Sequence, residues 1–314
     1  MSALTSVFII DPPDRLDPPT DTSLALMRES LDRGHRVFFC TLADLRLEKS
    51  EAWARVRQVE FFPGRELFAA GEAVEFALGG CDILHMRKDP PVDEAYLHAT
   101  FLLDRVPAEV LQVNPSRALR NHCEKLIPCH FPDLMPETVV TCDPAVLAAF
   151  LERVGHMVIK PLEDCSGHGV FALTRDDPDT FVRCREATAA GGRYVQGQEY
   201  LPRIVEGDKR VLLLGGEILG WLRRVPAAGD FRSNVNAGGT CAPCELTESD
   251  RAICDRIGSW LAREGIHLGG VDIVGEKVLE VNITSPSCLR EMNELAGTRL
   301  ECRILGYLEA LCPR

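Results

Sequence analysis

The chain has 314 residues, of which 46% are hydrophobic and 26% charged, and its formal net charge is -12. This length suits two or three domains, and the composition is that of a globular protein rather than a disordered or fibrous one. The acidic charge argues against a nucleic-acid or membrane-surface binder, and no apolar run is long enough to cross a bilayer. The opening "MSALTSVFIIDPP" does not resemble a secretory signal, so we expect a cytoplasmic protein without nucleic-acid or membrane partners.

The chain contains 13 cysteines, an odd number scattered along its length. Without a secretory signal we expect them to be reduced, and several lie among apolar neighbours. Only Cys241 and Cys244, in "TCAPCE", have the C-x-x-C spacing of a metal or redox site. A zinc site would need a second pair of ligands, which the sequence does not supply. We therefore expect structural cysteines, with a redox or regulatory role as the alternative.

The first 120 residues alternate between strand and helix patterns. "SVFIID" and "HRVFFCTL" are strand patterns on either side of a helix predicted over residues 23–35, where apolar residues recur at helical spacing. "DILHMRKDPP" reads as a strand entering a polar loop, and "AYLHATFLLDRV" as the next helix. This order predicts a small parallel sheet whose ligands collect beyond the carboxyl ends of the strands. Asp11 and the charged residues 87–89 lie there, and they indicate either a binding site or a solvated turn.

Further strand and helix patterns follow. "PAVLAAFLERVG" predicts an amphipathic helix, "HMVIKPL" and "GRYVQGQEYLP" predict strands, and "EDCSGHGVFAL" predicts a glycine-containing turn into a strand. "KRVLLLGGEILGWLRRVP" and "LGGVDIVGEKVLEVNI" each read as a hairpin, and "ESDRAICDRIGSWLAREG" as a helix. The polar stretch between the hairpins, about residues 226–244, lacks periodicity and is longer than ordinary loops. We expect it to be a mobile functional segment.

The second hairpin gathers oxygen-bearing side chains. Glu280 and Asn282 are two residues apart in a strand, so they point the same way. A three-residue loop over 275–277 would set Asp272 opposite Glu280, whereas a two-residue loop would split the two carboxylates between faces. The three-residue register predicts an all-oxygen cluster that suits Mg²⁺ or Mn²⁺ better than zinc. The alternative is a structural network in which arginines such as Arg290 pair with the carboxylates.

Basic residues accompany this cluster. Lys160 ends an apolar strand beside the "DCSGHG" turn, which suits phosphate binding although no Walker A or dinucleotide-binding glycine pattern is present. Lys125 follows a helix start expected at Asn121 and by itself reads as a surface lysine. Asp208 and Arg210 share one face of a strand start. Lysines, arginines, carboxylates and a glycine turn, without a protease-like signature, indicate phosphoryl transfer by positioning and charge neutralisation.

The order of these motifs resembles the ATP-grasp ligases and, more narrowly, prokaryotic glutathione synthetases. "NHCEKL", "VIKPL", "GQEYLP", "EGDKRVLLLGGE" and "RSNVNAGG" match the superfamily, while "MRKDPP" and "NITSPSCLRE" carry the narrower resemblance. The resemblance runs from the first strand to near residue 310. It implies an α/β protein with the ATP-grasp fold: an N-terminal Rossmann-like parallel-sheet domain over 1–122, a central lid domain over 123–200, and a C-terminal mixed-sheet domain over 201–314.

The resemblance also implies the reaction and its nucleotide site. ATP would phosphorylate the cysteinyl carboxylate of γ-glutamylcysteine, and glycine would attack the acyl phosphate to give glutathione, ADP and phosphate. The family further suggests a homo-oligomer, namely a tetramer. The residues expected to hold ATP are Lys125, Lys160, Ser166, Gly167, Gly169, Gln198, Glu199, Tyr200, Leu201 and Asp208.

By the same resemblance, two Mg²⁺ (or Mn²⁺) ions would be held by Asp272, Glu280 and Asn282. The mobile segment would close over the intermediate and exclude water. The expected catalytic residues are Arg210, which would stabilise the transferring phosphate or the acyl phosphate, and Arg224, Arg232 and Asn234, which lie in or beside the mobile segment. The expected substrate-binding residues are Asp11, Arg87, Ser285 and Arg290.

Two departures from the family pattern keep alternatives open. The glycine loop reads "DCSGHG" where the family has nearer D-G-x-G-G, and Thr240 replaces an expected basic residue after "AGG". The chain is therefore expected to be a glutathione synthetase, with an ATP-grasp ligase for another acid or amine as the second reading and a non-catalytic ATP-binding regulator as the third. Cys165 and the Cys241–Cys244 pair suggest sensitivity to oxidation.

Overall fold

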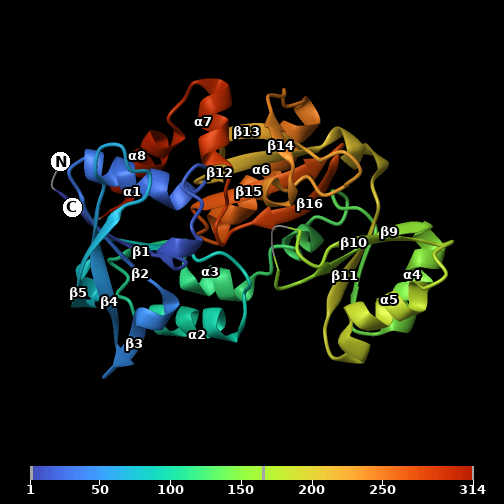
Figure 1. Cartoon of the computed structure of the whole chain (residues 1–314), viewed down its shortest axis with the longest axis horizontal. Coiled ribbons are helices and arrows are strands. Elements are labelled where there is room, and N and C mark those ends of the chain that lie inside the picture. Colours follow the sequence, from blue (N-terminus) through green and yellow to red (C-terminus); the bar gives the residue numbers. More distant parts are fainter. Residues whose placement is uncertain (1–2, 165–166, 313–314) are drawn as a thin grey trace.

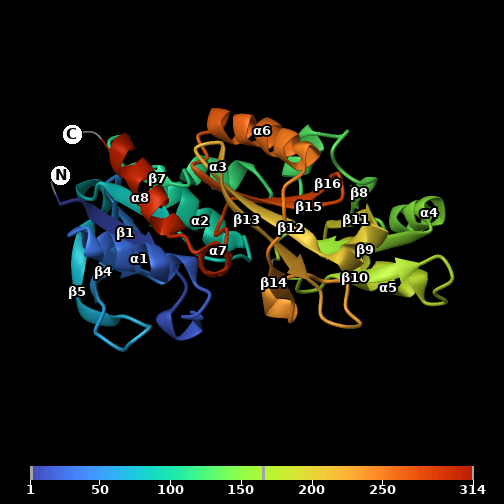
Figure 2. The same ribbon diagram turned by 90° about the horizontal axis from the view of Figure 1, so that it is seen from above.

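The computed structural model describes residues 3–164 and 167–312. Cys165 and Ser166, which the sequence analysis assigned to oxidation sensitivity and phosphate binding, lie outside the described residues. The strands of the described part form sheets that follow one another along the long axis, with β1 near one end and β9–β11 at the other (Figures 1 and 2). No helix in these residues has the length and apolar character needed to span a bilayer.

The first sheet has the strand order β3-β4-β2-β1-β6-β7, with β5 paired to β4. Strands β1, β2, β6 and β7 are parallel, as predicted, and their helices are α1–α3. The bounds are β1 Thr5–Ile9, α1 Thr22–Asp32, β2 Arg36–Cys40, β3 Leu45–Glu48, β4 Glu51–Glu60, β5 Ala69–Ala77, β6 Ile83–Met86, α2 Glu94–Leu103, β7 Leu111–Val113 and α3 Ser116–Asn121.

Two features of this region differ from the sequence-based expectation. Strands β3, β4 and β5 extend the parallel sheet in an antiparallel sense, and residues 45–77 had not been predicted as strands. Asn121 ends α3 and does not begin a helix, so the expected helix start there is wrong. Residues 122–126 instead lead out of α3 into a turn, closed by the Leu126 N–H bonded to the carbonyl oxygen of Cys123, and this turn carries Lys125.

The second sheet is antiparallel, in the order β10-β9-β11-β8. Helix α4 begins where the Asp143 carboxylate accepts the Ala145 N–H and Pro144 occupies the first turn, and it ends at Gly155 with φ of 78°. Helices α4 and α5 enclose an apolar cluster of their own with this sheet. The bounds are β8 Thr138–Thr141, α4 Pro144–Val154, β9 His156–Pro161, β10 Phe171–Thr174, α5 Thr180–Ala187 and β11 Val195–Glu199.

The third sheet is also antiparallel, in the order β14-β13-β12-β15-β16. Helix α6 packs on β12, β13 and β15, and α7 packs on β13. The apolar clusters of this sheet include residues of the first sheet, so the first and third sheets share a core. The bounds are β12 Asp208–Leu214, β13 Glu217–Val225, β14 Thr240–Ala242, α6 Glu248–Arg263, β15 Leu268–Val274, β16 Lys277–Asn282, α7 Leu289–Ala296 and α8 Leu300–Leu311.

The hairpin of β15 and β16 sets Asp272 opposite Glu280, as predicted, but by a different route. The turn is the two-residue Gly275–Glu276, with Val274 paired to Lys277, so the predicted three-residue loop is wrong. A β-bulge then shifts the register by one residue between Asp272 and Ile273. The bulge restores the pairing of the two carboxylates that a regular two-residue hairpin would have split.

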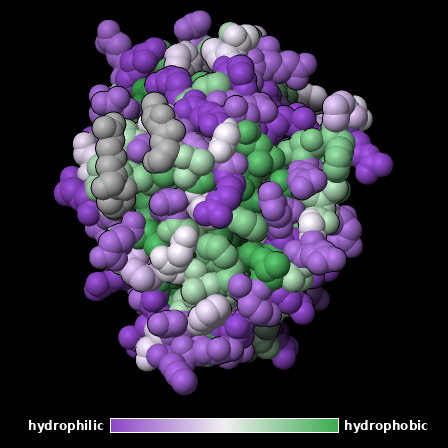
Figure 3. Space-filling view, turned by 90° about the vertical axis from the view of Figure 1, so that its left-hand side faces the viewer, coloured by the Kyte–Doolittle hydropathy of each residue, from purple (hydrophilic) through white to green (hydrophobic). Residues whose placement is uncertain are grey.

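The surface at the end formed by the first sheet is hydrophilic at its rim, with hydrophobic atoms gathered near its centre (Figure 3). In this sheet and its loops, Leu47, Phe62 and Val74 are each nearly half exposed. Strand β5 pairs only with β4 among the described strands, so its other edge is open. An open edge with apolar residues is suited to pairing with another chain.

Replacing Gly258 of α6 by alanine should destabilise the protein. A Cβ atom there would lie 1.9 Å from the carbonyl oxygen of Gly216, in the β12–β13 turn, so helix and turn must separate. We expect a loss of about 1–3 kcal/mol in the free energy of unfolding, measured by urea denaturation.

Gly306→Ala in α8 is the matched control, because its Cβ would meet only Arg33 Nη1, at 3.9 Å. That change should stabilise by about 0.5–1 kcal/mol through helix propensity. Equal effects of the two substitutions would contradict the close packing of α6 on the turn.

Candidate active site

Two adjoining cavities lie where the three sheets meet. The first, of about 780 Å³ including its open mouth, lies between β9 and β11 on one side and β12, β13, β15 and β16 on the other. The second, of about 1350 Å³ measured the same way, lies between the loops that follow β1 and β6 and the segment that follows β16. Arg224, Asn234 and Glu280 line both cavities. These three side chains therefore mark the place where ligands in the two cavities would meet.

Most of the residues predicted to bind ATP, metal or phosphate line the first cavity. The structure brings together there Lys125, Lys160, Gly167, Gln198, Glu199, Tyr200, Leu201, Asp208, Arg224, Arg232, Asn234, Asp272 and Glu280. The second cavity is lined by the remaining predicted residues Asp11, Arg87, Arg210, Asn282 and Ser285. Gly169 lines neither cavity, and Arg290 lies elsewhere.

A buried network of two arginines and two aspartates forms the floor between the cavities. Arg224 donates from Nε to Asp208 Oδ1 at 2.9 Å and pairs through Nη2 with Asp272 Oδ2 at 2.9 Å. Arg210 donates from Nη2 to the same Asp272 oxygen at 2.9 Å. Burial acts to raise the pKa of Asp272, but Arg210 and Arg224 outweigh it and hold that pKa below its usual range. The alternative of arginine-paired carboxylates is thus present, with Arg210 and Arg224 rather than Arg290 as the partners.

Glu280 differs from Asp272 in its surroundings. Its side chain is 21% exposed, against 4% for Asp272, and its ion-pair partner among the described residues is Lys125, with Nζ 3.4 Å from Oε1. Asn282 lies on the same face of β16 and donates from Nδ2 to Asp272 Oδ2 at 3.3 Å. Carboxylate and carboxamide oxygens therefore converge here, and Glu280 has the carboxylate most accessible to a ligand.

Lys125 and Lys160 both line the first cavity, and their pKa values are shifted in opposite directions. Burial acts to lower the pKa of Lys125, but Glu280 and Glu124 outweigh it and raise that pKa. Burial lowers the pKa of Lys160 to about 8, and the positive charge of Lys125 adds to the effect. Lys160 Nζ donates to Gln198 Oε1 at 2.7 Å, across the β9–β11 pair. An anionic ligand beside Lys160 would stabilise its charged form and raise that pKa again, so the site favours anions.

Glu124 is a buried residue of the site that sequence reasoning missed. Its Oε1 accepts the N–H of Ile283 at 2.6 Å, the N–H of Thr284 at 2.7 Å and the Thr284 hydroxyl at 2.9 Å. Burial, with Glu280 nearby, raises its pKa. These bonds hold the end of β16 against the segment that carries Lys125. In the sequence Glu124 is only an acid beside a lysine, and no local pattern predicts contacts across about 160 residues.

The bulge in β16 also shapes the apolar end of the first cavity. Leu279 and Glu280 are consecutive, yet both line it, which a regular strand would not allow. Val158, Leu201 and Ile204 add further apolar surface, and none of these except Leu201 had been predicted. Beside them the Tyr200 ring stacks on His156, with centroids 3.9 Å apart and planes 15° apart. This end of the cavity suits a flat, largely apolar ring.

The polar segment 226–244 covers the first cavity. Phe231, Arg232, Ser233 and Asn234 line it, and Arg232 pairs with Asp230 at 2.7 Å. Arg232 Nη1 also donates to the carbonyl oxygen of Gly167 at 3.4 Å, so this segment touches the glycine turn over the cavity. The last part of the segment forms strand β14 on the edge of β13 and was not predicted as a strand. Its mobility stays a prediction.

The second cavity joins charged residues from distant parts of the chain. Arg87 is buried and donates from Nε to Ser23 Oγ and from Nη2 to the carbonyl oxygen of Pro286, both at 3.1 Å. Asp11 pairs with Lys88 at 3.0 Å and accepts the Asp89 N–H at 2.9 Å. The predicted cluster at residues 87–89 is thus part of a cavity and not only a solvated turn.

Arg290 is the predicted substrate residue that the structure does not bring to the site. It lines a separate surface depression beside Glu29 and Arg299. Its guanidinium donates to the carbonyl oxygen of Pro18, in the loop whose neighbouring residues line the second cavity. Direct contact with a ligand in that cavity therefore has no support from its position.

The fold and this arrangement are those of an ATP-grasp protein. A RimK-domain ATP-grasp protein of Sphaerobacter thermophilus superposes with a TM-score of 0.65, at 18% identity over 97% of this chain and 99% of that one. The D-cycloserine synthetase DcsG superposes with a TM-score of 0.65, at 16% identity over 97% and 99%. At such identities the likeness establishes the fold.

Sequence comparison identifies the family within this fold. The model of the prokaryotic glutathione synthetase N-terminal domain matches residues 4–120, and that of its ATP-grasp domain matches residues 124–297. Proteins named glutathione synthetase are 42% identical in Gloeobacter violaceus and 39% identical in Salmonella typhimurium, each over 96% of this chain and at least 95% of the relative. The chain belongs to the prokaryotic glutathione synthetase family and is an ATP-dependent carboxylate–amine ligase.

Asp272→Asn and Glu280→Gln should differ in their effect on stability, because Asp272 is a buried structural carboxylate and Glu280 an accessible one. Neutralising Asp272 leaves two buried arginines short of a counter-charge, and we expect the free energy of unfolding to fall by about 3 kcal/mol. Neutralising Glu280 should cost less than about 1 kcal/mol, because its pair is longer and partly solvated. Urea unfolding midpoints measure both. A loss of stability in Glu280→Gln equal to that in Asp272→Asn would contradict this distinction.

Proposed function

We propose that this chain joins γ-glutamylcysteine to glycine, with ATP as the phosphate donor, and releases glutathione, ADP and phosphate. The observation that carries the proposal is the meeting of two cavities at Arg224, Asn234 and Glu280. One cavity has an apolar end and a lysine-rich end, as a nucleotide requires. The other is lined by charged groups suited to a zwitterionic peptide. Family membership supplies the identity of the acid and of the amine.

In the proposed site the nucleotide lies along the first cavity. The adenine ring occupies the apolar end beside Leu201 and Leu279, with Gln198–Leu201 at its edge, and Asp208 faces the ribose. Lys125 and Lys160 hold the phosphates, and the Gly167 backbone lies above them. The carboxylate of Asp208 already accepts two hydrogen bonds from Arg224, so it would bind ribose through its remaining lone pairs.

Asp272, Glu280 and Asn282 would hold the divalent cations. Their side chains offer only oxygen ligands for a cation, which suits Mg²⁺ or Mn²⁺. The ATP-grasp ligase PsnB, which shares this fold with a TM-score of 0.61, has a structure described as containing Mg and ADP. When bound, the cations would neutralise negative charge on the phosphates. Glu280 would supply the carboxylate oxygens that are most accessible to the cations.

The residues between the cavities would perform the transfer. The substrate carboxylate, held in the second cavity, attacks the terminal phosphate and forms an acyl phosphate, while Arg210 and Arg224 balance the charge that builds up. The glycine amine then attacks the acyl carbon and phosphate leaves. Arg232 and Asn234, from the covering segment, exclude water from this reactive intermediate.

The γ-glutamylcysteine site would use Asp11, Arg87 and Ser285. Asp11 is suited to an ammonium group and Arg87 to a carboxylate. We assign Arg290 a positioning role only, because it holds the backbone of Pro18 beside the cavity. The domain division at residues 122 and 200, a cytoplasmic location and a homotetramer complete the proposal, and the open edge of β5 offers a surface for self-association.

Phosphate release from purified protein tests this function. With ATP and Mg²⁺, we expect release only when γ-glutamylcysteine and glycine are both present, and mass spectrometry should detect glutathione. Glu280→Gln is the control, and its turnover should fall by several orders of magnitude while its fold is retained. ATP binding without release under these conditions would leave the ligase class in place and overturn the substrate pair, so other carboxylates and amines would then be screened.

Arg232→Ala should uncouple ATP use from product formation. The substitution removes the contact between the covering segment and Gly167, so water reaches the acyl phosphate. We expect phosphate release to exceed glutathione formation in the same reaction. Arg203→Ala is a suitable control, because that exposed arginine lines a different depression. Tight coupling in Arg232→Ala would rule out the covering role.

A further inference from the structure

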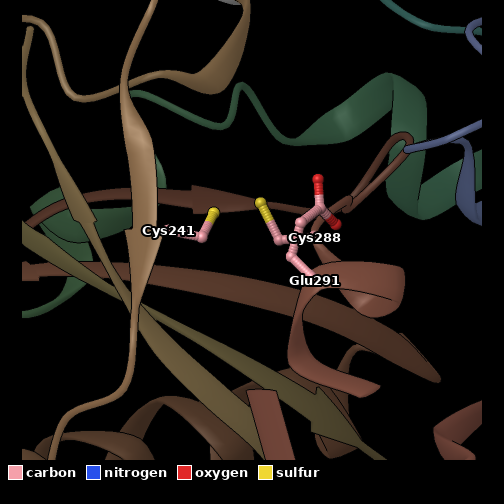
Figure 4. Close-up of side chains that lie close together, drawn as sticks. All are labelled: Cys241, Cys288 and Glu291. Atoms are coloured by element: carbon pink, nitrogen blue, oxygen red, sulfur yellow. The ribbon is translucent and has the colours of Figure 1, made fainter. Parts of the chain in front are cut away.

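A cluster of two cysteines and one glutamate lies beside the second cavity, which Cys288 and Glu291 help to line. Cys241 comes from β14, Cys288 immediately precedes α7, and Glu291 lies in its first turn. One ligand atom from each residue lies within 4.8 Å of the other two. Figure 4 shows the two sulfur atoms facing the space between the strand and the helix, with the glutamate beside Cys288. Two segments distant in sequence, β14 and the start of α7, thus present their ligand atoms together.

Hydrogen bonds among the described residues do not fully compensate the burial of this cluster. Cys288 is 3% exposed, and Glu291 Oε2 is buried without a hydrogen-bond partner among the described residues. An unpartnered buried carboxylate oxygen is costly and indicates a missing ligand. Cys288 also has φ of 76°, in the left-handed region that a non-glycine residue rarely adopts. Such conformations concentrate at functional sites.

A second cluster of similar composition differs in that arginines already pair with its carboxylates. Glu29, Glu301 and Cys302 also bring three ligand atoms within 4.8 Å. There, however, Glu29 pairs with Arg33 at 2.7 Å, and Arg299 pairs with Glu301 at 3.2 Å. Protein cations already neutralise those carboxylates, so that cluster needs no ion. No arginine or lysine pairs with Glu291 among the described ion pairs.

We propose that Cys241, Cys288 and Glu291 form a binding site for a soft divalent cation of the zinc class. Thiolate sulfur selects such ions over Mg²⁺, and two thiolates with one carboxylate fill three of the four tetrahedral positions. Cys288 and Glu291 line the second cavity, so the fourth position faces that cavity. The site is separate from the oxygen ligands on β15 and β16, and it does not depend on the proposed ligase reaction.

The surrounding charges suit this ligand set. Two thiolates and a carboxylate together carry three negative charges. A bound divalent ion would reduce this to one negative charge, which the nearby Arg210 and Arg224 would offset. A thiolate is the form that binds metal. A bound ion would tie β14, at the end of the covering segment, to the start of α7.

The C-x-x-C motif of the sequence contains only one of the proposed ligands, and this difference provides a test of the proposal. By spacing, Cys241 would be grouped with Cys244, but Cys244 is not part of the cluster. Its backbone carbonyl instead accepts the Trp221 indole N–H at 2.9 Å. Cys244→Ser is therefore a matched control for Cys241→Ser, because both change a cysteine of the same C-x-x-C motif.

The experiment uses the full chain, reduced and stripped of metal, and titrates it with Co²⁺ as a spectroscopic probe. We expect one equivalent to give a sulfur-to-cobalt charge-transfer band, which Zn²⁺ then abolishes by displacing Co²⁺. Co²⁺ in the oxygen site gives no such band. Cys241→Ser and Cys288→Ser should lose this equivalent, and Cys244→Ser should keep it. Glu291→Gln should keep sulfur ligation while affinity falls by about 10- to 100-fold.

A band that persists in Cys241→Ser or Cys288→Ser, or one that is lost in Cys244→Ser, would overturn the proposal. So would the absence of any band in the wild-type chain. Circular dichroism checks that each variant is folded. A second measurement needs no variant: Zn²⁺ should protect Cys241 and Cys288 of the wild-type chain from alkylation, as located by peptide mass spectrometry. Protection confined to other cysteines would equally refute the site.

Discussion

The buried pairing of Asp272 with Arg210 and Arg224 is the interaction on which the site depends. Each of these three side chains comes from a different strand, β15, β12 and β13, and each is about 95% or more buried. A charge in such a place is tolerated only when paired, so the strands must keep the register that joins them. This register also sets the positions of Asp208 at one end of the network and of Glu280 and Asn282 on the neighbouring strand. It thereby sets the boundary between the two cavities.

The acidic side chains of the site have different partners and therefore different roles. Asp272 and Asp208 are engaged by arginine, whereas Glu280 keeps oxygens accessible beside Lys125. Glu124, fully enclosed, holds the chain after β16 by accepting backbone N–H groups. Two acids thus neutralise buried charge, one braces the backbone, and one remains available to a ligand. Charge neutralisation by fixed groups is what phosphoryl transfer requires from a protein.

The sequence predicted those features of the site that follow from strand alternation and residue spacing. The shared face of Glu280 and Asn282 follows from the period of a strand, whereas their convergence with Asp272 depends on the bulge and not on the predicted three-residue loop. Prediction from the sequence failed where the outcome depended on distant contacts. The bulge that places both Leu279 and Glu280 in one cavity, the bracing role of Glu124, and the position of Arg290 all depend on packing between segments far apart in the chain. Strands β3 and β5 are largely exposed and give no clear buried face, whereas β4 alternates regularly between buried and exposed residues and was overlooked.

The two proposed metal sites differ in the character of their ligands. Ligand softness keeps them apart: the carboxylates and carboxamide of β15 and β16 favour a hard cation, while the sulfurs of Cys241 and Cys288 favour a soft one. Arg210 and Arg224 repel a cation placed between the two sets but stabilise the anionic ligands of both. The C-x-x-C spacing alone would have paired the wrong sulfurs, because β14 turns Cys241 toward α7. Folding, and not proximity in sequence, decides which thiols meet.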